Sequence, residues 1–448
     1  MLVVQMKSKL VMKKLFLSVG LVAAGTAGLQ AAYAPDQGSM DATRMWSISG
    51  SLRGFYDNNY TTGNSPSGSG GFEVSPQVSI NVPMQQTEFG MRFIYGLYYY
   101  QARANQNQNP VDQTFQTDLW LDHAFTERVQ VRVDDSFLIA QNPQLNTGGA
   151  VSQPFRTSQS YLANNGTVTL HNDWTRLFST SLRYHSDFYD YQNNGTTLAN
   201  FGTKGASLAG ELNRIGNSIG LDFQWHQTAT TMFFFGYQFS QVNYTGNEPI
   251  GLNIAPTTVP PTGYFYYSDS RNSRSHALYV GTTHNFLPNL VFTGRFGAQY
   301  TDYYNDPQNT TQWNPYGNLS LTYTYQPGCY AEIGFTEAMN STDQVSVDSN
   351  NGSITLSQQS SVIYGSLNHQ ITPKLRGALI GQVQFSSYNS GQYANEVDDL
   401  YSVGVSFSYA FNRHFSADIG NNFDMLKSQV PGRGYSRNEV YAGVTATY

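Results

Sequence analysis

Charged side chains recur on the polar face of several segments of this sequence in which polar and apolar residues alternate. Arginine offers a planar group with several hydrogen-bond donors, whereas carboxylates accept hydrogen bonds and attract cations. Groups of this kind on one wall either impose an electric field on a nearby solute or pair with each other across strands. Both interpretations apply to Arg53, Glu73, Arg92, Asp118, Asp122, Arg132, Asp134, Arg183, Asp187, Asp222, Arg295, Glu332, Arg376 and Asp418.

Residue types used in catalysis or metal binding are present, but without the spacing that such sites need. The histidines lie at strand ends and turns with no metal-ligand pattern: His171, His185, His226, His284, His369 and His414. No nucleophile elbow, phosphate-binding loop or dinucleotide fingerprint occurs. The single cysteine, Cys329, excludes an internal disulfide framework and a Cys-based metal site. The sequence therefore predicts no enzyme, metal or cofactor. A Ser, His and Asp or Asn constellation assembled on a barrel wall stays an alternative.

The segments that carry these residues alternate with a period of two, which is typical of β-strands. In residues 318–325, Leu and Tyr occupy one face, and Asn, Ser and Thr occupy the other. Residues 129–134, 215–225 and 406–411 repeat this pattern. The apolar face is almost free of charge, as a lipid-facing surface requires, because Arg or Lys at mid-depth costs about 2–4 kcal/mol. A soluble sandwich would also alternate, but its strands would be shorter.

Short polar turns flanked by large apolar residues recur along the chain. Clear copies lie at residues 125–129, 174–177, 286–290, 325–329, 371–375 and 411–415, and looser copies lie at 82–89 and 225–232. A period of this length also occurs in propellers, but a propeller blade needs four strands where this chain has two long ones. Short turns that alternate with long connections are typical of the two ends of a membrane barrel.

These patterns predict an all-β fold, an antiparallel transmembrane β-barrel over residues 46–448. Counting runs from Trp46 gives about 18 strands, with 16 as the alternative, and an even number places both chain ends on the turn side. The longer connections are rich in Gly, Asn, Ser and Pro, and comprise residues 58–71, 140–160, 193–213, 245–272 and 343–355. In the longest, the run Gly263–Tyr267 is either a constriction folded into the barrel or part of a surface loop.

The last residues, Tyr441–Tyr448, form an alternating strand that ends on an aromatic residue. An unpaired strand of this kind would invite aggregation, whereas a closed barrel pairs its last strand with its first. The segment resembles the C-terminal signal that the barrel-assembly machinery of bacterial outer membranes recognises. Gly443, Ala446 and Tyr448 hold the matching positions.

The beginning of the chain has the parts of a secretory signal peptide over residues 1–34. Lysines precede a short apolar run at residues 15–22, and an Ala-x-Ala end follows at 32–34. Residues 35–45 would then form a short periplasmic segment. Loss of the four lysines at positions 7, 9, 13 and 14 takes the net charge from −6 to −10, which argues against nucleic acid as a partner. Charged residues are 12% of the chain and aromatic residues are 14%. This charged fraction is about half the usual share for soluble domains.

Several stretches carry a resemblance to a known family. They are Ser-Leu-Arg-Gly-Phe-Tyr-Asp-Asn-Asn at residues 51–59, residues 72–76, residues 116–122 and the repeated turns. On the basis of these stretches, the whole mature chain resembles the second family of putative β-barrel porins of Gram-negative outer membranes. The resemblance implies an outer-membrane barrel that acts as a pore or as part of polysaccharide export, and it implies no individual site residue.

We therefore expect a porin-like channel of the Gram-negative outer membrane for passive or weakly selective diffusion of small hydrophilic solutes. One alternative is a conduit subunit for exopolysaccharide export, and another is a barrel hydrolase or adhesin with an occluded lumen. The expected partners are outer-membrane lipid, the barrel-assembly machinery, small hydrophilic solutes and further copies of the chain in a homo-oligomer.

Overall fold

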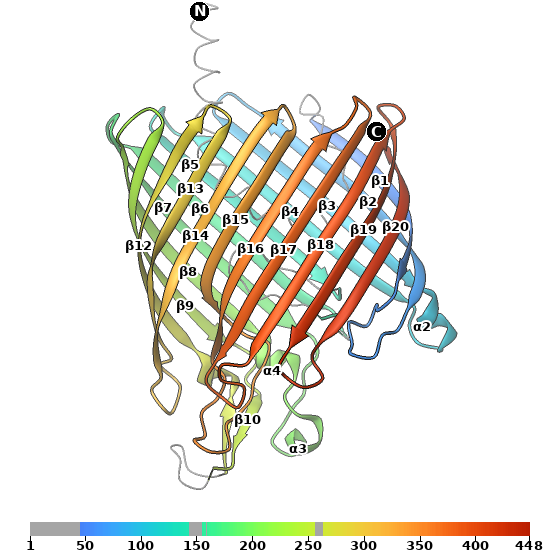
Figure 1. The fold of residues 1–448 in the computed structure, drawn as a ribbon, viewed down its shortest axis with the longest axis vertical. Helices are drawn as coiled ribbons and strands as arrows, with labels where there is room; N and C mark the ends of the chain where they lie inside the picture. Colours follow the sequence, from blue (N-terminus) through green and yellow to red (C-terminus); the bar gives the residue numbers. More distant parts are fainter. Residues whose placement is uncertain (1–44, 143–154, 158, 256–262) are drawn as a thin grey trace, which may run out of the picture.

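The protein, represented by a computed structural model, is described over residues 45–142, 155–157, 159–255 and 263–448. The predicted signal peptide, and the predicted periplasmic segment apart from Met45, lie outside these residues. The 18-stranded antiparallel sheet forms a closed barrel (Figure 1). Its first half comprises β1 (Trp46–Asp57), β2 (Ser69–Pro83), β3 (Thr87–Tyr100), β4 (Val111–Ala124), β5 (Val129–Ala140), β6 (Tyr161–Asp173), β7 (Phe178–Tyr191), β8 (Arg214–His226) and β9 (Thr231–Tyr244). Its second half comprises β12 (Ser273–Leu287), β13 (Leu290–Asp302), β14 (Thr311–Gln326), β15 (Cys329–Asn340), β16 (Ser357–Gln370), β17 (Leu375–Asn389), β18 (Val397–Ala410), β19 (Phe415–Ser428) and β20 (Tyr435–Thr447).

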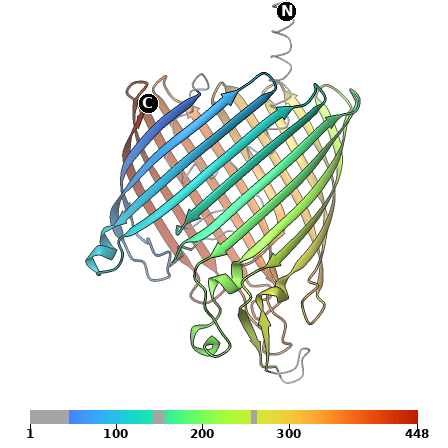
Figure 2. The same ribbon diagram turned by 180° about the vertical axis from the view of Figure 1, so that it is seen from behind.

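The barrel closes where the last strand pairs with the first. β1 pairs with β2 on one side and with β20 on the other, in a register that runs from Ser49 opposite Thr447 to Asp57 opposite Glu439. The rings of Trp46 and Tyr448 lie 5.8 Å apart at the turn end. Figures 1 and 2 show this end of the barrel at the top, with the C-terminus beside the start of β1. The predicted fold class is therefore confirmed, with 18 strands rather than 16.

The predicted turns and long connections alternate between the two ends. Every predicted short turn joins two neighbouring strands, as between β4 and β5 or between β18 and β19. The long connections all lie at the other end, which we call the loop end (Figure 2). They carry the remaining small elements, which are α2 (Gln101–Asn105), α3 (Phe201–Lys204), α4 (Leu208–Leu212), β10 (Pro249–Asn253), β11 (Tyr264–Tyr267) and η1 (Ser268–Arg271).

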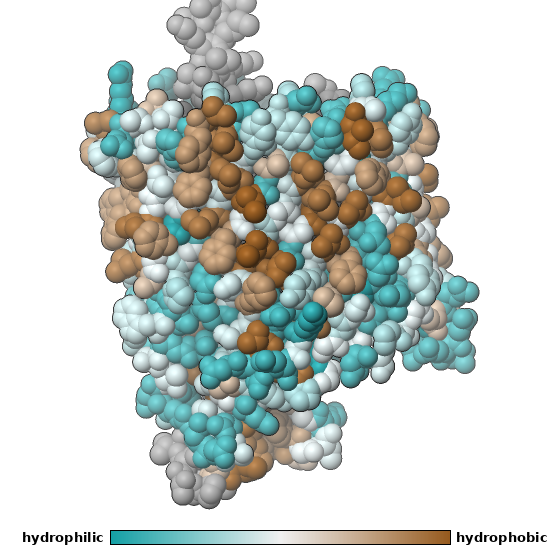
Figure 3. Space-filling view, in the orientation of Figure 1, coloured by the Kyte–Doolittle hydropathy of each residue, from teal (hydrophilic) through white to brown (hydrophobic). Residues whose placement is uncertain are grey.

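The outer wall is apolar because alternate residues of each strand point outward. Phe223, Phe296 and Ile333 are each more than half exposed, as lipid-facing side chains are when no lipid covers them. On the face in Figure 3, apolar residues gather toward the turn end, and polar residues gather toward the loop end. The strands therefore extend beyond the apolar belt on the loop side. Among the described residues, no helix is long and apolar enough to cross a membrane.

Several long connections pack together at the loop end. We call residues 192–213, 245–255, 263–272 and 341–356 the loop cap. Ile250, Tyr266, Ile354 and Leu356 are buried in its core. The aromatic run at Tyr264–Tyr267 is strand β11, paired with β10 in the cap, so these residues do not form the constriction inside the barrel that was one of the two predictions.

Gly443 stands opposite Arg53 at the closing seam, and its missing side chain makes room for that arginine. A Cβ at this position would lie 2.4 Å from Cγ of Arg53 and 2.8 Å from the carbonyl oxygen of Leu52. We expect Gly443→Ala to destabilise the folded barrel by about 1–3 kcal/mol through overpacking. The midpoint temperature of the mobility shift between folded and unfolded barrel on a gel measures this loss. Gly54→Ala is the control, because a Cβ there meets nothing within 4 Å; an equal drop in both variants would contradict the explanation.

Candidate functional site

A cavity of about 2050 Å³ occupies the lumen on one side of the barrel. Its wall comes from the inward faces of β3–β9 and β12–β15. At the turn end it reaches Arg128 and Arg176, and at the loop end it reaches Arg271 and Leu356 of the loop cap. The cavity therefore extends along the barrel and is bounded by the cap.

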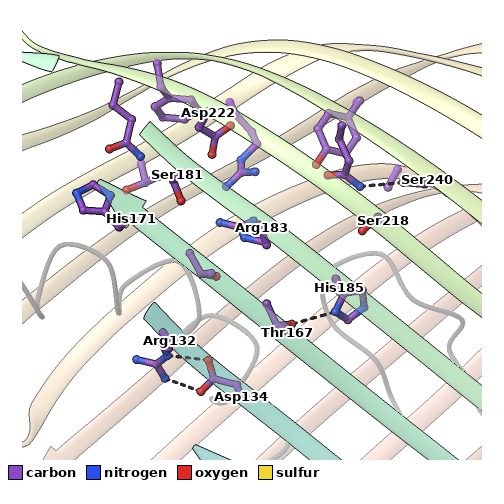
Figure 4. Close-up of a pocket in the computed structure, with 18 of the residues that line it drawn as sticks. Arg132, Asp134, Thr167, His171, Ser181, Arg183, His185, Ser218, Asp222 and Ser240 are labelled. Carbon is purple, nitrogen blue, oxygen red and sulfur yellow. Dashed lines mark hydrogen bonds and ion pairs between the residues drawn. The ribbon is translucent and has the colours of Figure 1, made fainter. Parts of the chain in front are cut away.

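The period of two places most of the predicted charged residues in this cavity. Those that line it are Arg92, Asp118, Arg132, Asp134, Arg183, Asp187, Asp222 and Arg295. Figure 4 shows four of them, Arg132, Asp134, Arg183 and Asp222, on strands of the same wall. Ser181, Ser218 and Thr167 lie among them. The site is therefore a polar wall with both signs of charge.

Carboxylates in the cavity pair locally with arginines. Arg92 of β3 stands opposite Asp118 of β4, with Nη2 of Arg92 2.6 Å from Oδ2 of Asp118. Nε of Arg132 lies 2.7 Å from Oδ2 of Asp134, two residues further along the same strand. Opposite charges are thus intermixed along the wall. They are not separated onto two opposing sides of the lumen.

Two of the predicted arginines in the cavity lack a carboxylate partner among the described residues. Arg183 of β7 forms no ion pair or hydrogen bond with a described residue, and Figure 4 shows no interaction drawn to it. Arg295 of β13 is 7% exposed and lies near the rings of Phe234 and Tyr279, 5.9 and 5.4 Å from its guanidinium carbon. Its Nε has no hydrogen-bond partner in the described part of the chain. The cavity therefore holds positive charge that no carboxylate in the described ranges contacts.

Three of the predicted residues form a buried cluster at the closing seam instead. Nη2 of Arg53 lies 2.8 Å from Oδ2 of Asp418, and its Nη1 lies 4.0 Å from Oε2 of Glu73. The guanidinium also lies over the ring of Tyr441. Arg53 is 4% exposed, so this cluster serves closure of the barrel rather than contact with a solute.

The other predicted residues lie on the wall outside the cavity lining. Asp122 of β4 is 3.9 Å from Arg132. Glu332 of β15 and Arg376 of β17 are partly buried and do not belong to the described residues that line the cavity.

Some charged residues of the cavity, the seam and the loop cap were not predicted from the sequence. Arg214 lines the cavity and lies 3.9 Å from Asp187, and Arg437 binds Asp57 at the seam. Strand parity could have identified Arg437 and Asp57, because they share their faces with Tyr441 and Arg53. No local pattern marks Arg271, because its partners come from distant loops.

Arg271 forms the underside of the loop cap above the cavity. It is fully buried, with 0% exposure, and lies over the ring of Tyr244. Its guanidinium donates to the carbonyl oxygens of Glu211 and Thr342 at 2.7 Å each, and to that of Leu356 at 3.5 Å. Loss of hydration raises the pKa of the nearby Glu211 carboxyl to about 8, while the charge of Arg271 opposes this shift.

The histidines bind their neighbours individually. His185 contacts Thr167 at 3.0 Å and His171 contacts Asp173 at 3.1 Å. Across the described residues, no group of three or more His, Cys, Asp or Glu is placed to hold a metal ion. Cys329 is buried in its turn, where its sulfur accepts a hydrogen bond from the backbone N–H of Gln370.

One Ser–His contact matches part of the hydrolase alternative. Oγ of Ser179 lies 2.9 Å from Nε2 of His226 and donates to Oε1 of Gln224 at 2.8 Å. Ser179 is only 2% exposed, and no described carboxylate forms a hydrogen bond with the other ring nitrogen of His226. A buried serine whose hydroxyl binds an amide is not poised for attack on a solute.

The closed barrel and its polar lumen define a porin-like β-barrel, and this fold indicates the outer membrane. The model of a family described as putative beta-barrel porin 2 matches residues 336–448, which confirms the resemblance seen in the sequence over that segment. No curated protein sequence matches the chain.

Solved structures with a similar fold have low sequence identity to this chain. OccK9 (OpdG) of Pseudomonas aeruginosa is 9% identical, with a TM-score of 0.43, over 90% of this chain and 98% of that one. OccAB4 of Acinetobacter baumannii is 10% identical, with a TM-score of 0.41, over 91% of this chain and 100% of that one. The ferric enterobactin receptor PfeA of Pseudomonas aeruginosa is 10% identical, with a TM-score of 0.43, over 90% and 81%. These similarities concern the fold alone.

Proposed function

We propose that the protein is an outer-membrane channel for passive or weakly selective diffusion of small hydrophilic solutes. The observation that carries this proposal is the polar cavity, which extends along the lumen from Arg128 and Arg176 at the turn end to the underside of the loop cap. Its wall of hydroxyl, amide and charged groups suits water and polar solutes, and its size suits small ones. Insertion through the barrel-assembly machinery and association into homo-oligomers stay predictions from the sequence.

Reconstitution of the purified full chain into planar bilayers tests the proposal. We expect stepwise single-channel currents. Neutral solutes of graded size are then added, and those that enter the lumen should decrease the current, because a filled pore carries fewer ions. The folded state is checked first by its heat-dependent mobility on a gel. A preparation that is folded by this criterion and electrically silent would overturn the channel function.

The export conduit stays a second candidate, since its lumen would also be polar. It requires periplasmic and inner-membrane partners, whereas a diffusion channel requires none. Deletion of the gene separates the two. Loss of surface polymer with unchanged uptake of small sugars favours the conduit, and the reverse result favours the channel.

A further inference from the structure

We propose that Arg183 anchors a binding site in the lumen for a small hydroxylated monocarboxylate. This inference rests on the proposed channel function and adds a solute class to it. Arg183 projects from the middle of β7, between Thr169 of β6 and Gly220 of β8 in the register of the sheet. It lines the cavity and is only partly buried.

The space beside Arg183 is open because Gly220 has no side chain. A Cβ on Gly220 would come no nearer than 3.8 Å to any neighbouring atom outside the adjoining residues, so the fold does not require glycine there for packing. By contrast, a Cβ on Gly216 would lie 2.2 Å from Oδ1 of Asp187. The absence of a side chain opposite Arg183 therefore leaves room at the guanidinium for a ligand.

The carboxylates around Arg183 already have other partners. Asp222 accepts a hydrogen bond of 2.6 Å from the hydroxyl of Tyr279, and Asp187 lies near Arg214 and His185. Arg183 itself forms neither an ion pair nor a hydrogen bond within the described residues (Figure 4). Its partly exposed guanidinium therefore has donors that no described residue uses, in a planar fork that matches the two oxygens of a carboxylate.

The neighbouring residues restrict the class of anion. Asp222 and Asp187 face the same cavity, so a second negative charge on the solute would be repelled. Ser181 lies two residues before Arg183 on β7, and Ser218 lies on β8 two residues before Gly220, the residue opposite Arg183. Both line the cavity, are labelled in Figure 4 and offer hydroxyl groups to the rest of the solute. Arg295, whose Nε lacks a partner among the described residues, adds positive charge to the wall. A single carboxylate carried by a polyhydroxylated chain fits this arrangement better than a dianion or an apolar acid.

Binding is tested on the folded full chain in detergent at low salt, with sodium gluconate as the probe and isothermal titration as the readout. We expect gluconate to bind the wild-type protein more tightly than neutral glucose, succinate or phosphate. Arg183→Gln should weaken gluconate binding about tenfold or more, because it removes the charge-assisted hydrogen bonds to the carboxylate. Arg183→Lys keeps the positive charge but loses the planar pair of donors, so its affinity for gluconate should lie between those of the wild-type protein and Arg183→Gln.

Arg376→Gln is the matched control, because it makes the same change on the wall outside the described cavity lining. It should bind gluconate as the wild-type protein does. Unchanged gluconate binding in folded Arg183→Gln would overturn the site, and tighter binding of phosphate or succinate than of gluconate would overturn the ligand class. Single-channel recording separates this inference from the channel function. Gluconate binding without conductance would overturn only the function, whereas conductance without gluconate binding would overturn only the site.

Discussion

Arg271→Ala is expected to open the loop cap while the barrel stays folded. The substitution removes the donor to three carbonyl oxygens, on Glu211, Thr342 and Leu356, in a place where the arginine is fully buried. A buried acceptor left without a donor costs about 1–3 kcal/mol. The cap should therefore lose on the order of 3 kcal/mol, which corresponds to about a hundredfold rise in the population of the open cap.

Limited proteolysis with chymotrypsin measures this opening, since the cap contains Phe201, Tyr264 and Phe265. The rate of cleavage within the cap should rise in proportion to the open population where closing is faster than cleavage. Arg274→Ala is the control. That arginine is exposed and forms no ion pair or side-chain hydrogen bond with a described residue, and its guanidinium carbon lies 4.3 Å from the centroid of the Tyr304 ring. Equal cleavage rates in Arg271→Ala and wild-type protein would show that Arg271 does not hold the cap closed.

The same variant connects the cap with transport. Arg271 lines the cavity at the loop end, so an open cap should widen the path to the outside. Single-channel conductance is therefore expected to rise in Arg271→Ala and to stay unchanged in Arg274→Ala. A cap that opens to protease without a change in conductance would mean that the cap does not limit the current.

The sequence was sufficient to predict the wall of the barrel. Outward and inward residues follow from alternation alone, as in β14, where Leu319 faces outward and Tyr316 lines the cavity. The turns could be predicted because each lies between two apolar anchors, such as Phe411 and Phe415. Both signals are local, and a two-residue period fixes the face of every residue once one is assigned.

The open part of the lumen could not be predicted from the sequence. Alternation assigns Arg183 and Arg376 equally to the inner face, yet only Arg183 is among the described residues that line the cavity. Which sector of a closed wall stays open depends on the loops that fold over it, and their contacts join residues far apart in the chain. Arg271 and Thr342 are one example, and Tyr266 and Gly352 are another.

The sequence predicted that charged residues on the wall could pair with each other, but it did not predict which residues form each pair. Arg92 and Asp118 pair across two strands, as the cross-strand interpretation expects. Arg132 pairs instead with Asp134 on its own strand, and Arg53 reaches Asp418 two strands away. The arginine side chain is long enough to reach several inward-facing neighbours, so strand register alone does not determine its partner.

Arg437→Met is expected to destabilise the closing seam by about 3–5 kcal/mol, because removal of one partner from a buried ion pair leaves charge without compensation. Nε of Arg437 donates to Asp57 of β1 at 2.8 Å, and its Nη2 donates to Glu439 at 2.8 Å. Nη1 lies 3.9 Å from Asp424 of β19. One side chain therefore joins three consecutive strands across the closure. Asp57 and Asp424 are at most 2% exposed, so water would not readily replace the lost cation.

The urea concentration at which the folded barrel loses its compact gel mobility measures the effect of Arg437→Met. Arg413→Met is the control, because Arg413 lies exposed in the turn between β18 and β19 and carries the same charge. Adding Asp57→Asn and Glu439→Gln to Arg437→Met should recover part of the stability, because fewer carboxylates then remain buried without a cation. If closure of the barrel depended on strand pairing alone, Arg437→Met and Arg413→Met would unfold at the same urea concentration. Recovery of stability on adding Asp57→Asn and Glu439→Gln would show that uncompensated charge, and not the shape of the methionine side chain, causes the loss of stability.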